Sequence, residues 1–324
     1  GPLHGLPMTV KEAYDLAGSP STHGIPAWRD NIASEDSTVV ARLKAAGAVI
    51  FGKTNLPYAM ADWQSYNDIY GTTRNPWNTD LVPGGSSGGS AAALAAGLTA
   101  AEAGSDIGSS IRNPAHYTGT FGLKPTWGIV PQRGHAPPQW RHQADVAVVG
   151  PMTRSAADLQ LLLDVMAGPE PIEAGAWTLK LAKPRLKTLK GLRIALKLGD
   201  PNVAVDREYA DVLQNLADRL AKAGAKVSDK AAPKVDTTHQ HDLYLTLYRA
   251  ALSAGSESDI AHWRKALKTP LGKTNERMLQ GMLQGNTLSH KEWLQLDNQR
   301  QHLRQRWAEF FDGWDLLLCP AAAG

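Results

Sequence analysis

The sequence has little of what disulfide-linked, metal-binding, membrane-spanning and nucleic-acid-binding proteins need. Its 324 residues include one cysteine, Cys319, which excludes an internal disulfide framework and a metal site built on several cysteines. No apolar run approaches the ~18 residues of a membrane-spanning helix, so no membrane span is expected. The net charge is only +3, from 34 basic and 31 acidic residues, and no dense basic run implies a nucleic-acid partner. His116, His135 and His142 lack metal-type spacing, so no metal or cofactor is expected.

The residues that are present have the pattern of a mixed α/β protein. A hydrophobic content of 43% and a charged content of 20% are ordinary for a globular chain. Segments with helical spacing of apolar residues alternate with short apolar runs, which predicts an α/β/α sandwich around a mixed β-sheet. Helices are predicted over 36–47, 89–102, 155–167, 206–223, 240–254, 257–268 and 291–311, and strands over 48–51, 192–198, 225–227 and 315–320.

Two clusters rich in serine and glycine dominate the stretch from Pro83 to Pro125. The first covers residues 84–90 and the second 104–110, and an alanine-rich segment joins them. Glycine lets a backbone adopt positive φ and approach other groups closely, and serine supplies hydroxyls that can donate, accept or attack. Two such loops joined by a helix of small residues would bring several hydroxyls and backbone N–H groups to one place.

Residues 47–54 match the phosphate-binding pattern G-x-x-x-x-G-K-T, which taken alone would suggest a nucleotide-binding protein. The intervening residues of such a loop must form an open nest of N–H groups around phosphates, whereas 48–51 is expected to pair in a strand. Pro57 would also block the helix that must follow. These conflicts argue against nucleotide binding.

Residues 84–88 match G-x-S-x-G, the nucleophile elbow of α/β-hydrolases. That elbow follows directly from an apolar strand. The preceding residues here, 78–83 (NTDLVP), make a poor strand end. An α/β-hydrolase is therefore disfavoured.

Ordered motifs run along the chain: GPLHGLPMTVKE at 1–12, GKTNLP at 52–57, GGSSGGS at 84–90, GSDIGSSIRNPA at 104–115, GLKPT at 122–126 and VVGPMTRSAADLQLLLDVMAGP at 148–169. They closely resemble the amidase signature family, serine hydrolases of C–N bonds that use a Ser–Ser–Lys triad. The resemblance implies a single domain over 1–324 around a large mixed β-sheet, with a signature core of about 1–167 and a more variable, substrate-side region of about 168–324. Family members usually extend beyond both ends of this stretch, so the chain is expected to be part of a longer protein, and its compartment stays open.

The resemblance assigns Ser110 as the nucleophile, Ser86 as the bridging serine and Lys11 as the base. A serine hydroxyl is a weak nucleophile until a base removes its proton. A lysine with the ordinary pKa, near 10.4, is protonated at neutral pH and cannot act as that base. Lys11 follows the apolar segment 6–10, where desolvation would lower its pKa and make it usable.

An oxyanion hole is expected from the backbone N–H groups of Ile107, Gly108 and Ser109, together with that of the nucleophile. Ser109 stands where the family usually has glycine, and a positive φ there would introduce strain of order 1 kcal/mol. Asp106 and Arg112 flank the nucleophile and are expected either to pair with each other or to contact substrate.

The resemblance also implies a small-molecule amide as substrate, without saying which amide. Met60 and Ala61 are candidate walls of an acyl pocket. Ser87 is a candidate substrate-binding residue, although it and Ser105 are expected mainly to form hydrogen bonds to the backbone. Two alternatives stay open: the glutaminase subunit of a tRNA-dependent amidotransferase, which needs partner proteins, and a catalytically inactive scaffold. The oligomeric state is not readable from the sequence.

Overall fold

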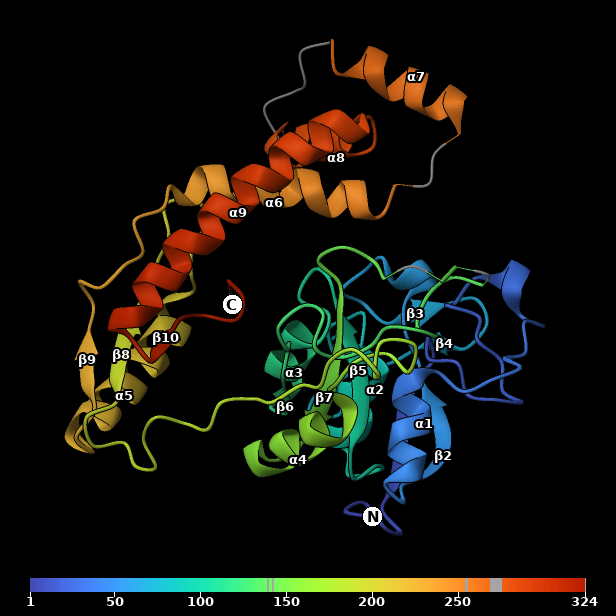
Figure 1. Cartoon of the computed structure of the whole chain (residues 1–324), viewed down its shortest axis with the longest axis horizontal. Helices are drawn as coiled ribbons and strands as arrows, with labels where there is room; N and C mark the ends of the chain where they lie inside the picture. The colour runs from blue at the N-terminus through green and yellow to red at the C-terminus, as the bar shows by residue number, and fades with distance from the viewer. Residues whose placement is uncertain (139, 142, 254–255, 269–275, 324) are drawn as a thin grey trace. The chain divides into compact units, whose positions relative to one another are not determined.

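The computed structural model describes residues 1–138, 140–141, 143–253, 256–268 and 276–323 (Figure 1). The chain divides into two compact units, Gly1–Leu181 and Ala182–Gly324. The division falls after the internal boundary predicted near 167, so the first part of the predicted substrate-side region belongs to the first unit. Within the described residues, the structure has no helix that is both long and apolar enough to span a membrane.

The first unit is built on a five-stranded mixed sheet with strand order β2-β1-β5-β7-β6. β1 runs parallel to both β2 and β5, whereas β7 runs antiparallel to β5 and β6. The sheet is therefore mixed, which confirms the predicted fold class. Its strands are β1 (Pro7–Lys11), β2 (Val49–Thr54), β5 (Glu102–Asp106), β6 (Phe121–Gly122) and β7 (Val148–Thr153).

Helices cover both faces of this sheet. The main apolar cluster joins one face to α1 (Thr38–Ala45) and α4 (Ala156–Met166), and Met8 and Val10 of β1 belong to it. A second cluster joins Met152 of β7 to two further helices. These helices are α2 (Gly88–Ala95) and α3 (Arg112–Thr118). Because side chains alternate along a strand, Lys11 points away from the face that buries Met8 and Val10.

The ends of these helices follow local chemistry. The Ser37 and Ser155 hydroxyls accept the N–H groups of Val40 and Asp158, as expected for N-caps of α1 and α4. The prediction that the helix after the first serine cluster runs to 102 was wrong. It ends at Ala95, Gly97 takes a φ of 72°, and the chain then enters β5. A left-handed residue of this kind is a common helix terminator.

Short elements complete the first unit. Strands β3 and β4 form a two-residue antiparallel pair. Along the chain, one 3-10 turn precedes α1 and another follows β2. These elements are η1 (Pro26–Trp28), η2 (Tyr58–Met60), β3 (Tyr66–Asn67) and β4 (Gly71–Thr72).

The second unit combines a three-stranded parallel sheet, of order β10-β8-β9, with helices. The strands are β8 (Arg193–Leu196), β9 (Lys226–Ser228) and β10 (Leu316–Leu318). The helices are α5 (Arg207–Lys222), α6 (Thr237–Ala251), α7 (Glu257–Ala266), α8 (Glu276–Gly285) and α9 (His290–Gly313).

Helix α8 was not predicted. Two glycines within ten residues lower the helical propensity of this segment. In the structure these glycines allow close packing on α6. A Cβ at Gly281 would lie 2.8 Å from Leu245 Cβ, and one at Gly285 would lie 2.4 Å from the carbonyl oxygen of Thr246.

Candidate active site

Lys11 is the last residue of β1, and its side chain is fully buried. Its Nζ lies 2.6 Å from Ser86 Oγ and 2.9 Å from Ser105 Oγ. Ser105 belongs to β5, the strand beside β1, whereas Ser86 lies in the loop that precedes α2. The amine of Lys11 thus joins two neighbouring inner strands of the sheet, β1 and β5, to the first serine loop.

The environment of Lys11 favours the neutral amine. Desolvation by burial lowers its pKa from 10.5 to about 7, although the nearby Asp106 carboxylate acts in the opposite direction. A lysine with this pKa is partly deprotonated at neutral pH and can accept a proton. Its contact with Ser86 is therefore one through which a proton can pass.

Ser110 lies between β5 and α3, in the second serine loop, and is 5% exposed. The two serine loops are hydrogen-bonded together through Ser87. The Ser87 N–H donates to the carbonyl oxygen of Ser110 at 3.1 Å. The Ser87 hydroxyl donates to the carbonyl oxygen of Ser105 at 3.3 Å. Of the predicted triad, Lys11 and Ser86 are in contact, and Ser110 lies in the adjoining loop. Across the described residues, no hydrogen bond joins the Ser86 and Ser110 hydroxyls.

Asp106 organises the backbone around Ser110. Its carboxylate is fully buried, accepts the N–H groups of Ser109 and Ile111 at 3.0 Å each, and pairs with Arg112 at 2.8 Å. Burial alone would raise the pKa of Asp106, but the Arg112 guanidinium and the backbone donors hold it below the ordinary value. Of the two roles predicted for Asp106 and Arg112, the structure shows the mutual pair.

Ser109 has a φ of 76°, the left-handed value that glycine adopts without strain. Its N–H donates to Asp106 at 3.0 Å. The carbonyl oxygen of Gly108 accepts the indole N–H of Trp63 at 2.8 Å. Nothing in the sequence around Trp63 predicts this contact.

The predicted acyl-pocket residues, Met60 and Ala61, lie in a segment that passes close to the first serine loop. A Cβ at Gly85 would lie 2.6 Å from the carbonyl oxygen of Asp62, so the two backbones are in direct contact. Met60 is half-buried and Ala61 is exposed. Ser87, by contrast, is fully buried and its hydroxyl bonds to the backbone, so we leave it out of the proposed substrate site.

The structure rejects both competing motifs. The lysine and threonine of the phosphate-loop pattern, Lys53 and Thr54, lie inside β2, and Lys53 pairs with Val10 of β1. The backbone there is committed to a sheet and cannot form a nest of N–H groups. No strand precedes residues 84–88 either, because 79–83 is turn and irregular structure and Asn78 forms only an isolated bridge with Asn75. The nucleophile-elbow geometry is therefore absent from this described stretch.

No cluster of three or more histidine, cysteine, aspartate or glutamate side chains among the described residues is arranged to hold a metal ion. His135 is half-buried, and desolvation holds its pKa well below the ordinary value. His142 lies outside the described residues.

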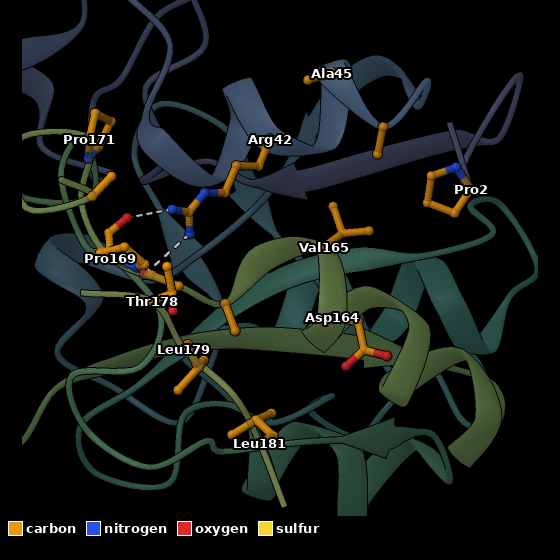
Figure 2. A pocket seen from close by; sticks show the side chains of 14 residues that line it. Pro2, Arg42, Ala45, Asp164, Val165, Pro169, Pro171, Thr178, Leu179 and Leu181 are labelled. Atoms are coloured by element: carbon orange, nitrogen blue, oxygen red, sulfur yellow. Dashed lines mark hydrogen bonds between the residues drawn. The ribbon is translucent and has the colours of Figure 1, made fainter. Parts of the chain in front are cut away.

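A separate hollow with a volume of about 880 Å³ lies between α1, α4 and the segment 168–181 (Figure 2). Arg42 extends into it and donates to the backbone carbonyls of Met166, at 2.6 Å, and Pro169. Its described lining residues include none of the predicted site residues. This hollow is therefore a feature of its own and not the site built on the serine loops.

Comparison with known proteins identifies relatives of this chain. The whole chain, residues 1–324, matches the family model described as Amidase. It is 33% identical to an indoleacetamide hydrolase of Bradyrhizobium diazoefficiens, over 99% of this chain and 60% of that protein. It is also 33% identical to an acylamidase of Rhodococcus erythropolis, over 100% of this chain and 66% of that protein.

The fold agrees with the sequence matches. A solved structure described as fatty acid amide hydrolase aligns with a TM-score of 0.82 at 27% identity, covering 100% of this chain and 57% of that one. The chain thus spans between 57% and 66% of the length of these three proteins. With a family model that matches it from end to end, the chain belongs to the amidase signature family.

Proposed function

We propose that this chain hydrolyses a small-molecule carboxylic amide to an acid and ammonia or an amine, through an acyl-enzyme on Ser110. The observation that carries the proposal is the contact of Lys11 with Ser86, made by a buried amine whose pKa is lowered to about 7. The names of the two curated relatives, an indoleacetamide hydrolase and an acylamidase, are those of amide hydrolases and support the same reaction class.

In the proposed first step, neutral Lys11 accepts a proton from Ser86 while Ser86 accepts one from Ser110. The Ser110 Oγ then bonds to the amide carbon, and the carbonyl oxygen becomes an oxyanion. When the C–N bond breaks, the proton returns from Lys11 through Ser86 to the departing nitrogen. Water then attacks the acyl-enzyme by the same proton path, releases the acid and restores Ser110.

The oxyanion requires fixed donors, and we assign the backbone N–H groups of Ile107 and Gly108, with that of Ser110, to this role. Ser109 is a weaker candidate because its N–H already donates to Asp106. One donor of this kind stabilises a transition state by about 2.7–4 kcal/mol. Met60 and Ala61 are proposed as part of the wall that contacts the acyl group.

The proposal is tested by intact-mass spectrometry and peptide mapping after incubation with an alkyl fluorophosphonate. Attack by an activated serine forms an O–P bond, breaks the P–F bond and leaves one covalent adduct. We expect a single adduct that maps to Ser110, with Ser110→Ala as the blank. A folded protein that stays unlabelled, or one that carries the adduct on another serine, would contradict the proposal.

The labelling rate is expected to rise with pH through about 7 and then to level off. The lysine pKa is lowered to about 7 by desolvation, so Lys11 is protonated below that pH and neutral above it. Only the neutral form accepts the Ser86 proton, so the rate should fall about tenfold for each pH unit below the pKa. Rates measured between about pH 5.5 and 9 check this, and a rise centred near the ordinary lysine pKa of about 10.4 would contradict it.

A further inference from the structure

One peptide group in the second serine loop is held at both of its ends. The peptide that joins Gly108 to Ser109 has its carbonyl oxygen on Gly108 and its N–H on Ser109. The carbonyl oxygen accepts the Trp63 indole N–H at 2.8 Å, and the N–H donates to Asp106 Oδ1 at 3.0 Å. Both bonds must break before this peptide plane can rotate.

The same peptide group borders a strained residue. Ser109 has a φ of 76°, which costs a residue with a Cβ about 1–3 kcal/mol relative to a relaxed conformation. Rotation of the peptide plane changes φ of Ser109 and ψ of Gly108, so it is the motion that would relieve this strain. It would also move the carbonyl oxygen of Gly108, which adjoins the backbone N–H groups proposed as oxyanion donors.

Trp63 is positioned to oppose that rotation. Its backbone lies against Gly85, where an added Cβ would meet the Trp63 carbonyl carbon at 2.9 Å. Gly85 directly precedes Ser86, so Trp63 packs on one serine loop with its backbone and bonds to the other with its indole. The side chain is 53% exposed, so its ring is not held by burial in the core.

We propose that Trp63 is a positioning residue that holds the 108–109 peptide in its strained, productive orientation. This inference rests on the proposed function, in which Ser110 attacks and the neighbouring amides receive the oxyanion. Trp63 acts through its bond to Gly108 and does not touch the reacting atoms. Through one hydrogen bond it compensates for the strain of a serine that adopts positive φ at position 109.

The test is the Trp63→Phe variant, which keeps an aromatic ring and removes the N–H donor. The fluorophosphonate inactivation constant kinact should fall roughly five- to tenfold, as for the loss of one hydrogen bond, while KI stays unchanged. Trp77→Phe is the matched control, because its indole N–H also donates to a backbone carbonyl, that of Thr118, at 2.8 Å. This control should label at the wild-type rate.

A rescue experiment separates this role from general stabilisation. Glycine adopts positive φ without strain, so Ser109→Gly should restore most of the kinact that Trp63→Phe loses. A Trp63→Phe protein that labels as fast as wild type, or one that Ser109→Gly does not rescue, would overturn the inference.

The thermal stabilities of wild type, Trp63→Phe, Ser109→Gly and the double variant test the role of Trp63 independently of activity. If the indole bond holds a strained peptide, losing it lets Ser109 relax. The Tm loss caused by Trp63→Phe should therefore be smaller in the wild-type background than in the Ser109→Gly background, where no strain is released. Equal Tm losses in both backgrounds would refute the role of Trp63. An unlabelled wild type with coupled Tm losses would refute the proposed function and leave the role of Trp63 standing.

Discussion

Replacing Lys11 by methionine should slow fluorophosphonate labelling of Ser110 about a thousandfold, the middle of the range for loss of a positioned general base. Methionine has a similar length and an apolar stem, so it can occupy the buried site at the end of β1. Neither Ser86 nor Ser105 can then pass its proton to an amine, although both hydroxyls remain. Because methionine nearly conserves the volume of the buried lysine stem, the variant should still fold.

Lys53→Met is the matched control for this experiment. Lys53 is in β2, where it pairs with Val10 of β1, and desolvation lowers its pKa to about 8. Its Nζ contacts Ser21 Oγ at 3.0 Å and the carbonyl oxygen of Pro20, not the serine loops. Its loss should change the labelling rate less than about threefold. Equal effects of the two substitutions, at matched Tm values, would argue against Lys11 as the base.

Asp106→Ala should destabilise the first unit by about 3 kcal/mol, because it removes the acceptor of three backbone N–H groups and the ion-pair partner of Arg112. The Arg112 side chain is 46% exposed, so most of the effect should come from the unpaired backbone N–H groups of Ser109, Ile111 and Arg112. Urea unfolding followed by tryptophan fluorescence measures the change in the free energy of unfolding. The contribution of Asp106 is present above its ordinary pKa of 3.8 and lost as the pH falls through its lower, folded-state value.

The control for Asp106 is Glu35→Gln. Glu35 also pairs with arginine, accepting from Arg133 and Arg141 at 3.1 Å each, but its side chain is 53% exposed. Exposed ion pairs contribute about 1 kcal/mol or less, so this substitution should barely move the unfolding midpoint. A small loss in Asp106→Ala, comparable to that in Glu35→Gln, would show that the loop does not depend on the buried carboxylate.

The sequence predicted the low pKa of Lys11 partly for the wrong physical reason. The expectation relied on the apolar residues that precede it, but Met8 and Val10 point to the opposite face of β1. Lys11 is instead desolvated by β5 and by the loop before α2. It contacts Ser105 of β5 and Ser86 of that loop. The sequence identified an apolar segment at 6–10, and only the assembled sheet supplies the partners of Lys11.

The contacts that define the site are long-range, which limits what a single sequence can reveal. Lys11 and Ser105 are 94 positions apart, and Trp63 and Gly108 are 45 apart. Local patterns predicted helices beginning near 36 and 155, and the structure caps them at Ser37 and Ser155, where a cap and its partner lie within one turn. The pairing of Trp63 with the second serine loop depends on how the segment from η2 to β3 crosses Gly85, and no local periodicity encodes that path.

The burial of Lys11 also makes folding depend on pH. Between about pH 7 and 10.5 the unfolded lysine holds a proton that the folded lysine has given up. Each molecule that folds in this range therefore releases up to one proton from this residue to the buffer. The contribution of Lys11 to stability thus improves as the medium becomes more alkaline, and the same group that would accept a proton during catalysis must first surrender one during folding.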